Sequence, residues 1–161
     1  MKNFPIVLFL FLLLVSCNNG GAQKSTERKH DGVVGTFQSG AYTVADEAYF
    51  KEQWEAALHK NGVHSPLAAF AILKTTTTGD AVRDCYMLTA KTKDNNTMVA
   101  SLLVKQGNNL YFDKKNHIST ICAGRCAHGC NPVAIVKKYK VQLVCLNCAD
   151  CVKTEVDMDF Y

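Results

Sequence analysis

The chain has 161 residues, which is enough for one domain with a hydrophobic core and too few for two domains of ordinary size. It carries 18 Lys and Arg against 14 Asp and Glu, a formal net charge of +4, and these charges are spread along the sequence. A nucleic-acid-binding surface concentrates its cations on one face, so the sequence predicts no nucleic-acid partner. Eight cysteines are about twice the number expected in a cytosolic protein of this length.

Residues 1–16 have the pattern of a secretory signal peptide. Lys2 provides a positive charge, residues 6–15 contain no polar side chain, and the small residue Ser16 follows them. As a helix, the apolar segment would rise about 15 Å, roughly half of a bilayer core, so it is too short to span a membrane. We therefore expect export from the cytoplasm and removal of this segment.

The end of the apolar segment, Leu14-Val15-Ser16-Cys17, resembles the lipobox of bacterial lipoproteins. The resemblance implies that Cys17 becomes the mature N-terminus and carries a diacylglyceryl thioether and an amide-linked acyl chain such as palmitate. Two or more acyl chains hold a protein on a membrane essentially permanently, so the membrane is an expected partner. Asn18 stands where Asp signals inner-membrane retention in the enteric version of this family, so the resemblance implies the outer membrane.

Residues 17–32 contain almost no apolar side chains beyond Cys17 and cannot bury enough surface to fold. They are typical of a flexible tether. About 15 such residues span on the order of 20 Å, which would lift a folded domain clear of the lipid headgroups.

The next segment has helical periodicity over residues 44–61. Its apolar residues form one stripe, at Phe50, Trp54, Ala57 and Leu58. Thr43 and Asp46 resemble a capping box at the start, and Gly62 ends the helix. We expect the stripe to pack on a sheet, with Trp54 as its main core residue.

Three segments with strand character follow, at residues 82–93, 97–105 and 110–113, and short polar turns separate them. Short turns join antiparallel neighbours, and residues 97–105, apolar on both faces, favour a central position. Residues 69–77 fit either a strand or a short helix. The expected fold class is α+β, in which residues 33–118 form one amphipathic helix packed on an antiparallel β meander.

Six cysteines lie in the last third of the chain, residues 119–161. They form two triplets: Cys122, Cys126 and Cys130, then Cys145, Cys148 and Cys151. Segments with strand character, residues 134–144 and 152–161, follow the triplets, so the two triplets are expected to face each other in a small cysteine-rich β module.

Disulfide bonding is the first interpretation of the triplets. The export signal sends the chain to an oxidising compartment, where thiols pair. The module has too few large apolar side chains to fold unaided, and such segments are typically stapled by disulfides. Six cysteines allow 15 pairings; we favour bridges between the triplets, because these clamp two loops together.

A metal site is the second interpretation. The spacing of Cys122, Cys126, Cys145 and Cys148 is close to that of zinc ribbons, with four thiolates in a tetrahedron. His128, between two cysteines, is the histidine to consider as a further ligand.

A redox site is the third interpretation. Cys145, Cys148 and Cys151, with Cys130 before Pro132, faintly resemble the iron–sulfur run of ferredoxins. Cys145 and Cys148 also have the spacing of a thioredoxin dithiol, without the βαβ context that makes it specific.

No catalytic residue is predicted, because the common nucleophile, phosphate-loop and metalloprotease motifs do not occur in the sequence. Cys85 lies within a predicted strand and is expected to be a core cysteine; a bridge to a triplet and a nucleophile are its alternatives. The basic runs Lys114-Lys115 and residues 137–140 are expected to be solvated strand ends or loops.

The sequence thus predicts a lipid-anchored lipoprotein of the cell envelope, a non-catalytic binding or accessory component that contacts other envelope proteins. The alternative is a metal-binding lipoprotein, with zinc or an iron–sulfur cluster, or a thiol-redox lipoprotein, each using the two triplets. An inhibitor-like role through the meander loops is a third hypothesis.

Overall fold

The computed structural model describes residues 32–146 and 148–157. Cys17, the predicted signal segment and most of the predicted tether lie outside these residues. The described residues form one helix, α1 (Glu47–Lys60), and eleven strands. The strands are β1 (Val33–Gln38), β2 (Ala41–Val44), β3 (Leu67–Thr76), β4 (Thr78–Gly79), β5 (Asp84–Thr92), β6 (Thr97–Gln106), β7 (Asn109–Phe112), β8 (Ile118–Ala123), β9 (Asn131–Lys137), β10 (Lys140–Leu146) and β11 (Val152–Asp157).

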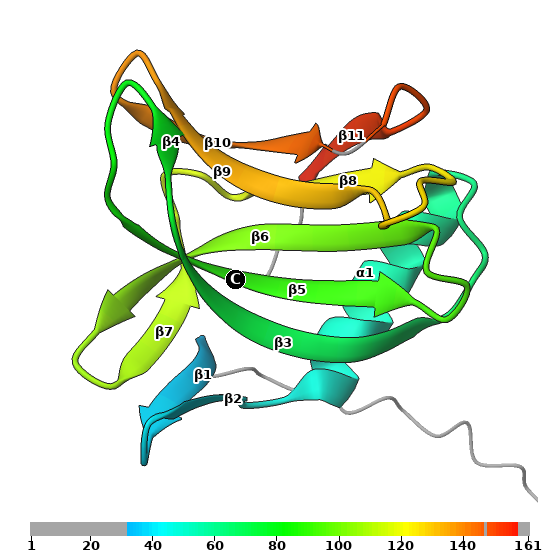
Figure 1. Cartoon of the computed structure of the whole chain (residues 1–161). Coiled ribbons are helices and arrows are strands. Elements are labelled where there is room, and N and C mark those ends of the chain that lie inside the picture. The colour runs from blue at the N-terminus through cyan, green and yellow to red at the C-terminus, as the bar shows by residue number, and fades with distance from the viewer. Residues whose placement is uncertain (1–31, 147, 158–161) are drawn as a thin grey trace, which may run out of the picture.

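The strands form two sheets, which Figure 1 shows together with the helix. The main sheet has eight strands; its longest path runs β11-β8-β6-β7-β1-β2, and β5 and β3 continue it from the other edge of β6. The small sheet has the order β10-β9-β4. Helix α1 lies behind β3 and β5 in Figure 1. Side chains alternate along β5, so that Leu88 packs in the core with α1 while Met87 packs with small-sheet residues. The main sheet is therefore the middle layer of three.

The central position predicted for residues 97–105 is confirmed in β6. One edge of this strand pairs with β5. Its other edge pairs with β8 at residues 97–100 and with β7 at residues 103–106. A ten-residue strand needs both partners on that edge because β7 is only four residues long and cannot bond all of the backbone groups of β6.

The predicted helical stripe is also confirmed. Phe50, Trp54 and Leu58 are fully buried in the main core, and Ala57 packs at its border. Trp54 stacks on Phe70 of β3, with ring centroids 5.6 Å apart. Trp54 is therefore the main helical core residue, as its size and position predict.

The start of the helix differs from the prediction. Thr43 is not a cap, because it pairs with Thr36 in the β1–β2 hairpin and its backbone belongs to that ladder. Asp46 is the N-cap, and its Oδ1 accepts a hydrogen bond of 2.9 Å from the backbone N–H of Tyr49. The helix begins at Glu47, three residues later than predicted.

Two further differences concern hairpins. The β1–β2 hairpin was not predicted, although Ser39-Gly40 between two apolar segments is a turn signal. Residues 134–144, predicted as one strand, form β9 and β10 with a turn at Lys138 and Tyr139. That turn has no Gly, Asn or Pro to mark it. Residues 69–77, left open between strand and helix, belong mostly to strand β3.

The α+β class is confirmed, but a meander followed by a separate β module is not the arrangement found. Strands β8 and β11, from the cysteine-rich third, belong to the main sheet, and β4 from the preceding part pairs with β9 in the small sheet. A division of the chain at residue 118 therefore does not coincide with a division between sheets. The small sheet packs on the main sheet through a second core of Cys85, Met87, Ala100, Leu102, Ala134 and Leu143.

Candidate functional site

Three disulfides join the two cysteine triplets, so the prediction of disulfide bonding is confirmed. The bridges are Cys122–Cys145, Cys126–Cys148 and Cys130–Cys151. Each cysteine pairs with its counterpart in the other triplet, first with first and third with third. All three bridges run between the triplets, which is the kind of pairing that the sequence favours; the order of pairing is left open by the sequence.

The elements around the cysteines explain this pairing. Cys122 lies in β8 of the main sheet and Cys145 in β10 of the small sheet, so the first bridge ties the two sheets together. Cys126 and Cys148 lie in the β8–β9 and β10–β11 loops. Cys130 immediately precedes β9. The three bridges therefore clamp the ends of four strands and the two loops that connect them.

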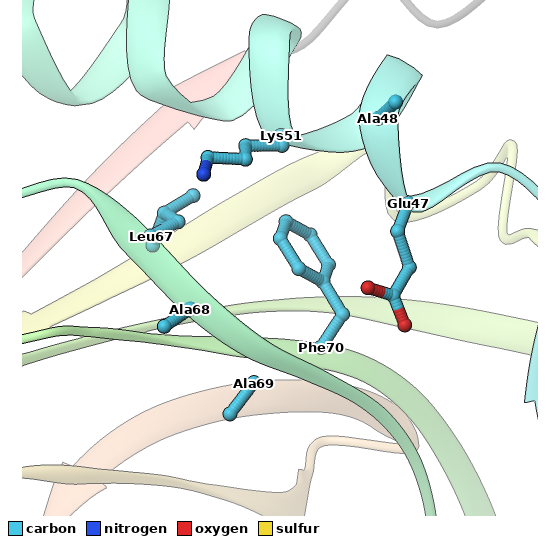
Figure 2. Close-up of a pocket in the computed structure, with 7 residues that line it drawn as sticks. All are labelled: Glu47, Ala48, Lys51, Leu67, Ala68, Ala69 and Phe70. Atoms are coloured by element: carbon cyan, nitrogen blue, oxygen red, sulfur yellow. The ribbon is translucent and has the colours of Figure 1, made fainter.

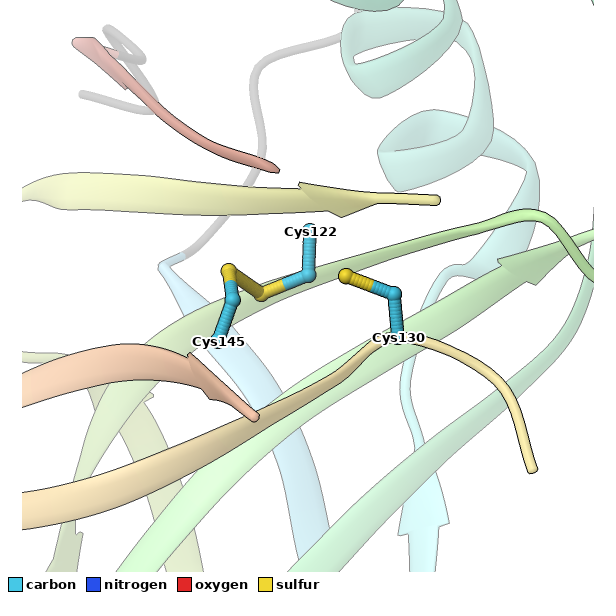
Figure 3. Close-up of side chains that lie close together, drawn as sticks. All are labelled: Cys122, Cys130 and Cys145. Atoms are coloured by element: carbon cyan, nitrogen blue, oxygen red, sulfur yellow. A yellow bond between two sulfur atoms is a disulfide. The ribbon is translucent and has the colours of Figure 1, made fainter. Parts of the chain in front are cut away.

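The sulfur atoms are crowded around Cys130. Its Sγ lies within 4.8 Å of the Sγ atoms of Cys122 and Cys145, and also within 4.8 Å of those of Cys126 and Cys151. Figure 3 shows the Cys130 sulfur directed toward the Cys122–Cys145 bridge. Cys130 itself is buried. Cys130 therefore lies close to sulfur atoms of both neighbouring disulfides, Cys122–Cys145 and Cys126–Cys148.

The same geometry bears on the metal interpretation. Within the described residues the close groups of three sulfurs both contain Cys130, and neither is the predicted zinc-ribbon set. His128 is exposed and belongs to neither group; its carbonyl accepts a hydrogen bond from the Asn131 side chain. In the disulfide form these sulfurs are not thiolates, so either group would bind a metal only after reduction.

Cys85 is a buried free thiol in the second core and is 7% exposed. Burial raises the pKa of this thiol above its ordinary value, while Arg83 acts in the opposite direction. A thiol kept neutral in an apolar core is a poor nucleophile. Cys85 is therefore the core cysteine that its strand position predicts.

A pocket of about 310 Å³ lies between the start of α1 and the start of β3, and Figure 2 shows its lining. Glu47 and Lys51 supply one charge of each sign from the helix, and Phe70 supplies an aromatic wall. The strand leaves its regular ladder here, with a register shift between Ala68 and Ala71 and a positive φ at Ala69. Sequence reasoning missed this pocket because no Gly or Pro marks the bulge that opens it.

No known protein family, curated protein or solved structure matches this chain. Among the described residues, no helix has the length and apolar character needed to cross a bilayer.

Proposed function

We propose that this protein is a lipid-anchored lipoprotein of the cell envelope, held on the outer membrane through Cys17, and that its domain is a non-catalytic binding or accessory module. The observation that carries the proposal is the pairing of all six triplet cysteines. Such pairs persist outside the reducing cytoplasm. The lipobox-like segment Leu14-Val15-Ser16-Cys17 supplies the route of export and the anchor.

The binding role has a physical basis in the pocket between α1 and β3. Its volume of about 310 Å³ is at the lower end of the range for small-molecule sites. The side chains of Glu47 and Lys51 stand beside the apolar surface of Phe70, an arrangement that suits a small amphipathic ligand or a side chain of another envelope protein.

The anchor is tested by expressing the full-length protein and its Cys17→Ser variant in a bacterial host with an outer membrane. We expect the wild type in the outer-membrane fraction, with a mass increased by acyl groups, and the variant absent from that fraction and without the added mass. Cys85→Ser is the matched control, because it removes a thiol without touching the lipobox. If wild type and Cys17→Ser fractionate alike, the proposed anchor is wrong.

A metal-binding or thiol-redox role is the second candidate, and the crowding of sulfurs at Cys130 favours it. This role requires a reduced form with an accessible set of thiolates. Reduced protein, kept free of oxygen, is titrated with zinc in the presence of a chromophoric chelator. This role predicts one tight site that Cys130→Ser removes and Cys85→Ser retains; equal zinc binding by both variants would reject it.

A further inference from the structure

The turn of the β9–β10 hairpin has a backbone conformation that is unusual for the residue types it contains. Lys137 pairs with Lys140, so the turn has two residues, and both have positive φ: 48° at Lys138 and 65° at Tyr139. Asn-Gly is the usual occupant of such a turn, because a side chain on a left-handed residue costs free energy. Lys and Tyr stand here against that preference, which suggests that their side chains serve something other than stability.

A second segment, distant in sequence, holds this turn in place. The Asp80 carboxylate accepts a hydrogen bond of 2.7 Å from the backbone N–H of Lys138. The Arg83 guanidinium donates one of 3.2 Å to the carbonyl of Tyr139. The backbone N–H of Asp80 in turn donates to the carbonyl of Val136. The turn and the loop after β4 therefore form one supported tip, and Figure 1 shows them side by side, projecting from the body of the domain.

The tip exposes the two most accessible large apolar side chains among the described residues. Tyr139 is 93% exposed and Val82 is 77% exposed. Four exposed cations flank these residues in the sequence: Arg83 follows Val82, and Lys137, Lys138 and Lys140 stand on either side of Tyr139. The charge of Asp84 is offset by an ion pair of 2.8 Å with Lys74. The Asp80 carboxylate accepts only the backbone N–H of Lys138 and stays negative, so it offsets one of the four cations and the tip remains positively charged.

We propose that this tip docks on the surface of an anionic phospholipid bilayer. Tyrosine favours the headgroup region, where its ring is in apolar surroundings and its hydroxyl is hydrated. Lysines near such a surface are attracted by the negative lipid charge. A projecting tip with an aromatic apex fits a soft, flat surface, whereas a protein partner would need a matching cavity. The proposal goes beyond the anchor at Cys17, since the tip would contact lipid without acyl chains.

The test uses the chain from residue 17 onward carrying Cys17→Ser, so that no acyl chain contributes. Its binding is measured by co-sedimentation with vesicles of phosphatidylethanolamine and phosphatidylglycerol, and with vesicles of pure phosphatidylcholine. The tip variant combines Lys138→Asn with Tyr139→Gly, which places the preferred residues in the turn and therefore preserves the fold. The control variant, Lys60→Gln with Lys93→Gln, removes two cations from the end of α1 and from the β5–β6 turn.

We expect the parent chain to prefer the anionic vesicles and the tip variant to lose affinity by about tenfold, with a thermal midpoint at or above the parent value. The control variant should bind within about twofold of the parent. The proposal is overturned if the parent does not prefer anionic vesicles, if the tip variant binds as the parent does, or if the control loses as much. Binding to soluble polyglutamate but not to vesicles would also overturn it, in favour of an acidic protein partner.

Discussion

Gly124 and Asp150 lie so close together that a side chain on Gly124 has no room. A Cβ there would be 2.6 Å from the carbonyl oxygen of Asp150, well inside van der Waals contact. Gly124 lies in the first cysteine-bearing loop and Asp150 in the second. The disulfides therefore join two loops whose backbones already touch, and the glycine is what permits that approach.

Gly124→Ala should lower the free energy of unfolding by about 1–3 kcal/mol, because the added methyl group must push the two loops apart against the bridges. Urea denaturation of the oxidised protein measures this. Gly107→Asn is the control, since a Cβ at Gly107 meets nothing within 4 Å and Asn tolerates its positive φ. Equal stability of Gly124→Ala and the parent would show that the loops are not held in contact.

The three disulfides should contribute different amounts to the free energy of unfolding, although they close loops of nearly equal length. Their sequence separations are 23, 22 and 21 residues, so each contributes about 3 kcal/mol by restricting the unfolded chain. Differences between them must therefore arise in the folded state. Cys122 is fully buried between the sheets, whereas Cys148 is exposed.

Replacing Cys122 and Cys145 together by Ser should consequently cost more stability than replacing Cys126 and Cys148 together. The first pair of hydroxyls lies between packed sheets, and the second lies in loops near solvent. Thermal denaturation of both double variants decides the order. The reverse order would mean that the loops, rather than the junction between the sheets, depend most on their bridge.

Trp54 should tolerate Phe far better than Ala. Trp54→Ala leaves a large cavity in the main core and should cost about 3–5 kcal/mol. The indole N–H of Trp54 is buried and meets no acceptor among the described residues. Trp54→Phe removes this unpaired donor along with part of the ring, so its cost should stay below about 2 kcal/mol. Chemical denaturation of the two variants tests the difference; equal losses would contradict it.

Asp94 should contribute a small, pH-dependent stabilisation. The Thr92 hydroxyl and the Asn96 backbone N–H bond to its carboxylate and lower its pKa below the ordinary value. A lowered pKa gives stability that is present above the unfolded-state pKa of about 3.9 and is lost as the pH falls through the folded-state value. Solvent screening limits the effect to a few tenths of a kcal/mol.

Asp94→Asn should therefore be slightly less stable than the parent at pH 7, with the gap closing in acid as the parent carboxylate becomes protonated. Unfolding curves for both proteins across that pH range provide the measurement. If the difference in stability between the two proteins persists unchanged below pH 3 (about one unit under the ordinary pKa), it arises from the changed side-chain group and not from the loss of its charge.

The sequence predicts most elements of this fold because their patterns are local. The stripe ending at Leu58 and the apolar faces of β6 follow from the spacing of side chains alone. The order of the strands in the sheet is harder to predict from the sequence, because the pairing of β8 with β6 depends on how far β7 extends. The β9–β10 turn escapes prediction for a different reason: Lys138 and Tyr139 adopt a backbone that their side chains disfavour, and Asp80 and Arg83 from a distant segment support it.

The candidate site likewise has features that the sequence predicts and features that it does not. Paired triplets are predictable, since two sets of cysteines at strand ends, in a sequence that begins with an export-signal pattern, favour bridges. The order of pairing and the crowding at Cys130 require the folded arrangement of both sheets. The pocket beside Phe70 depends on a bulge at Ala69 that no residue type announces.

The most direct measurement concerns the sulfur atoms of the protein isolated from the envelope without reductant. The protein is unfolded, its free thiols are alkylated, and the mass and the cystine-linked peptides are determined. One alkylated cysteine, Cys85, together with linked peptides for the pairs 122–145, 126–148 and 130–151, is the predicted result. Alkylation of the six triplet cysteines would contradict the proposal that this domain is held together by disulfides.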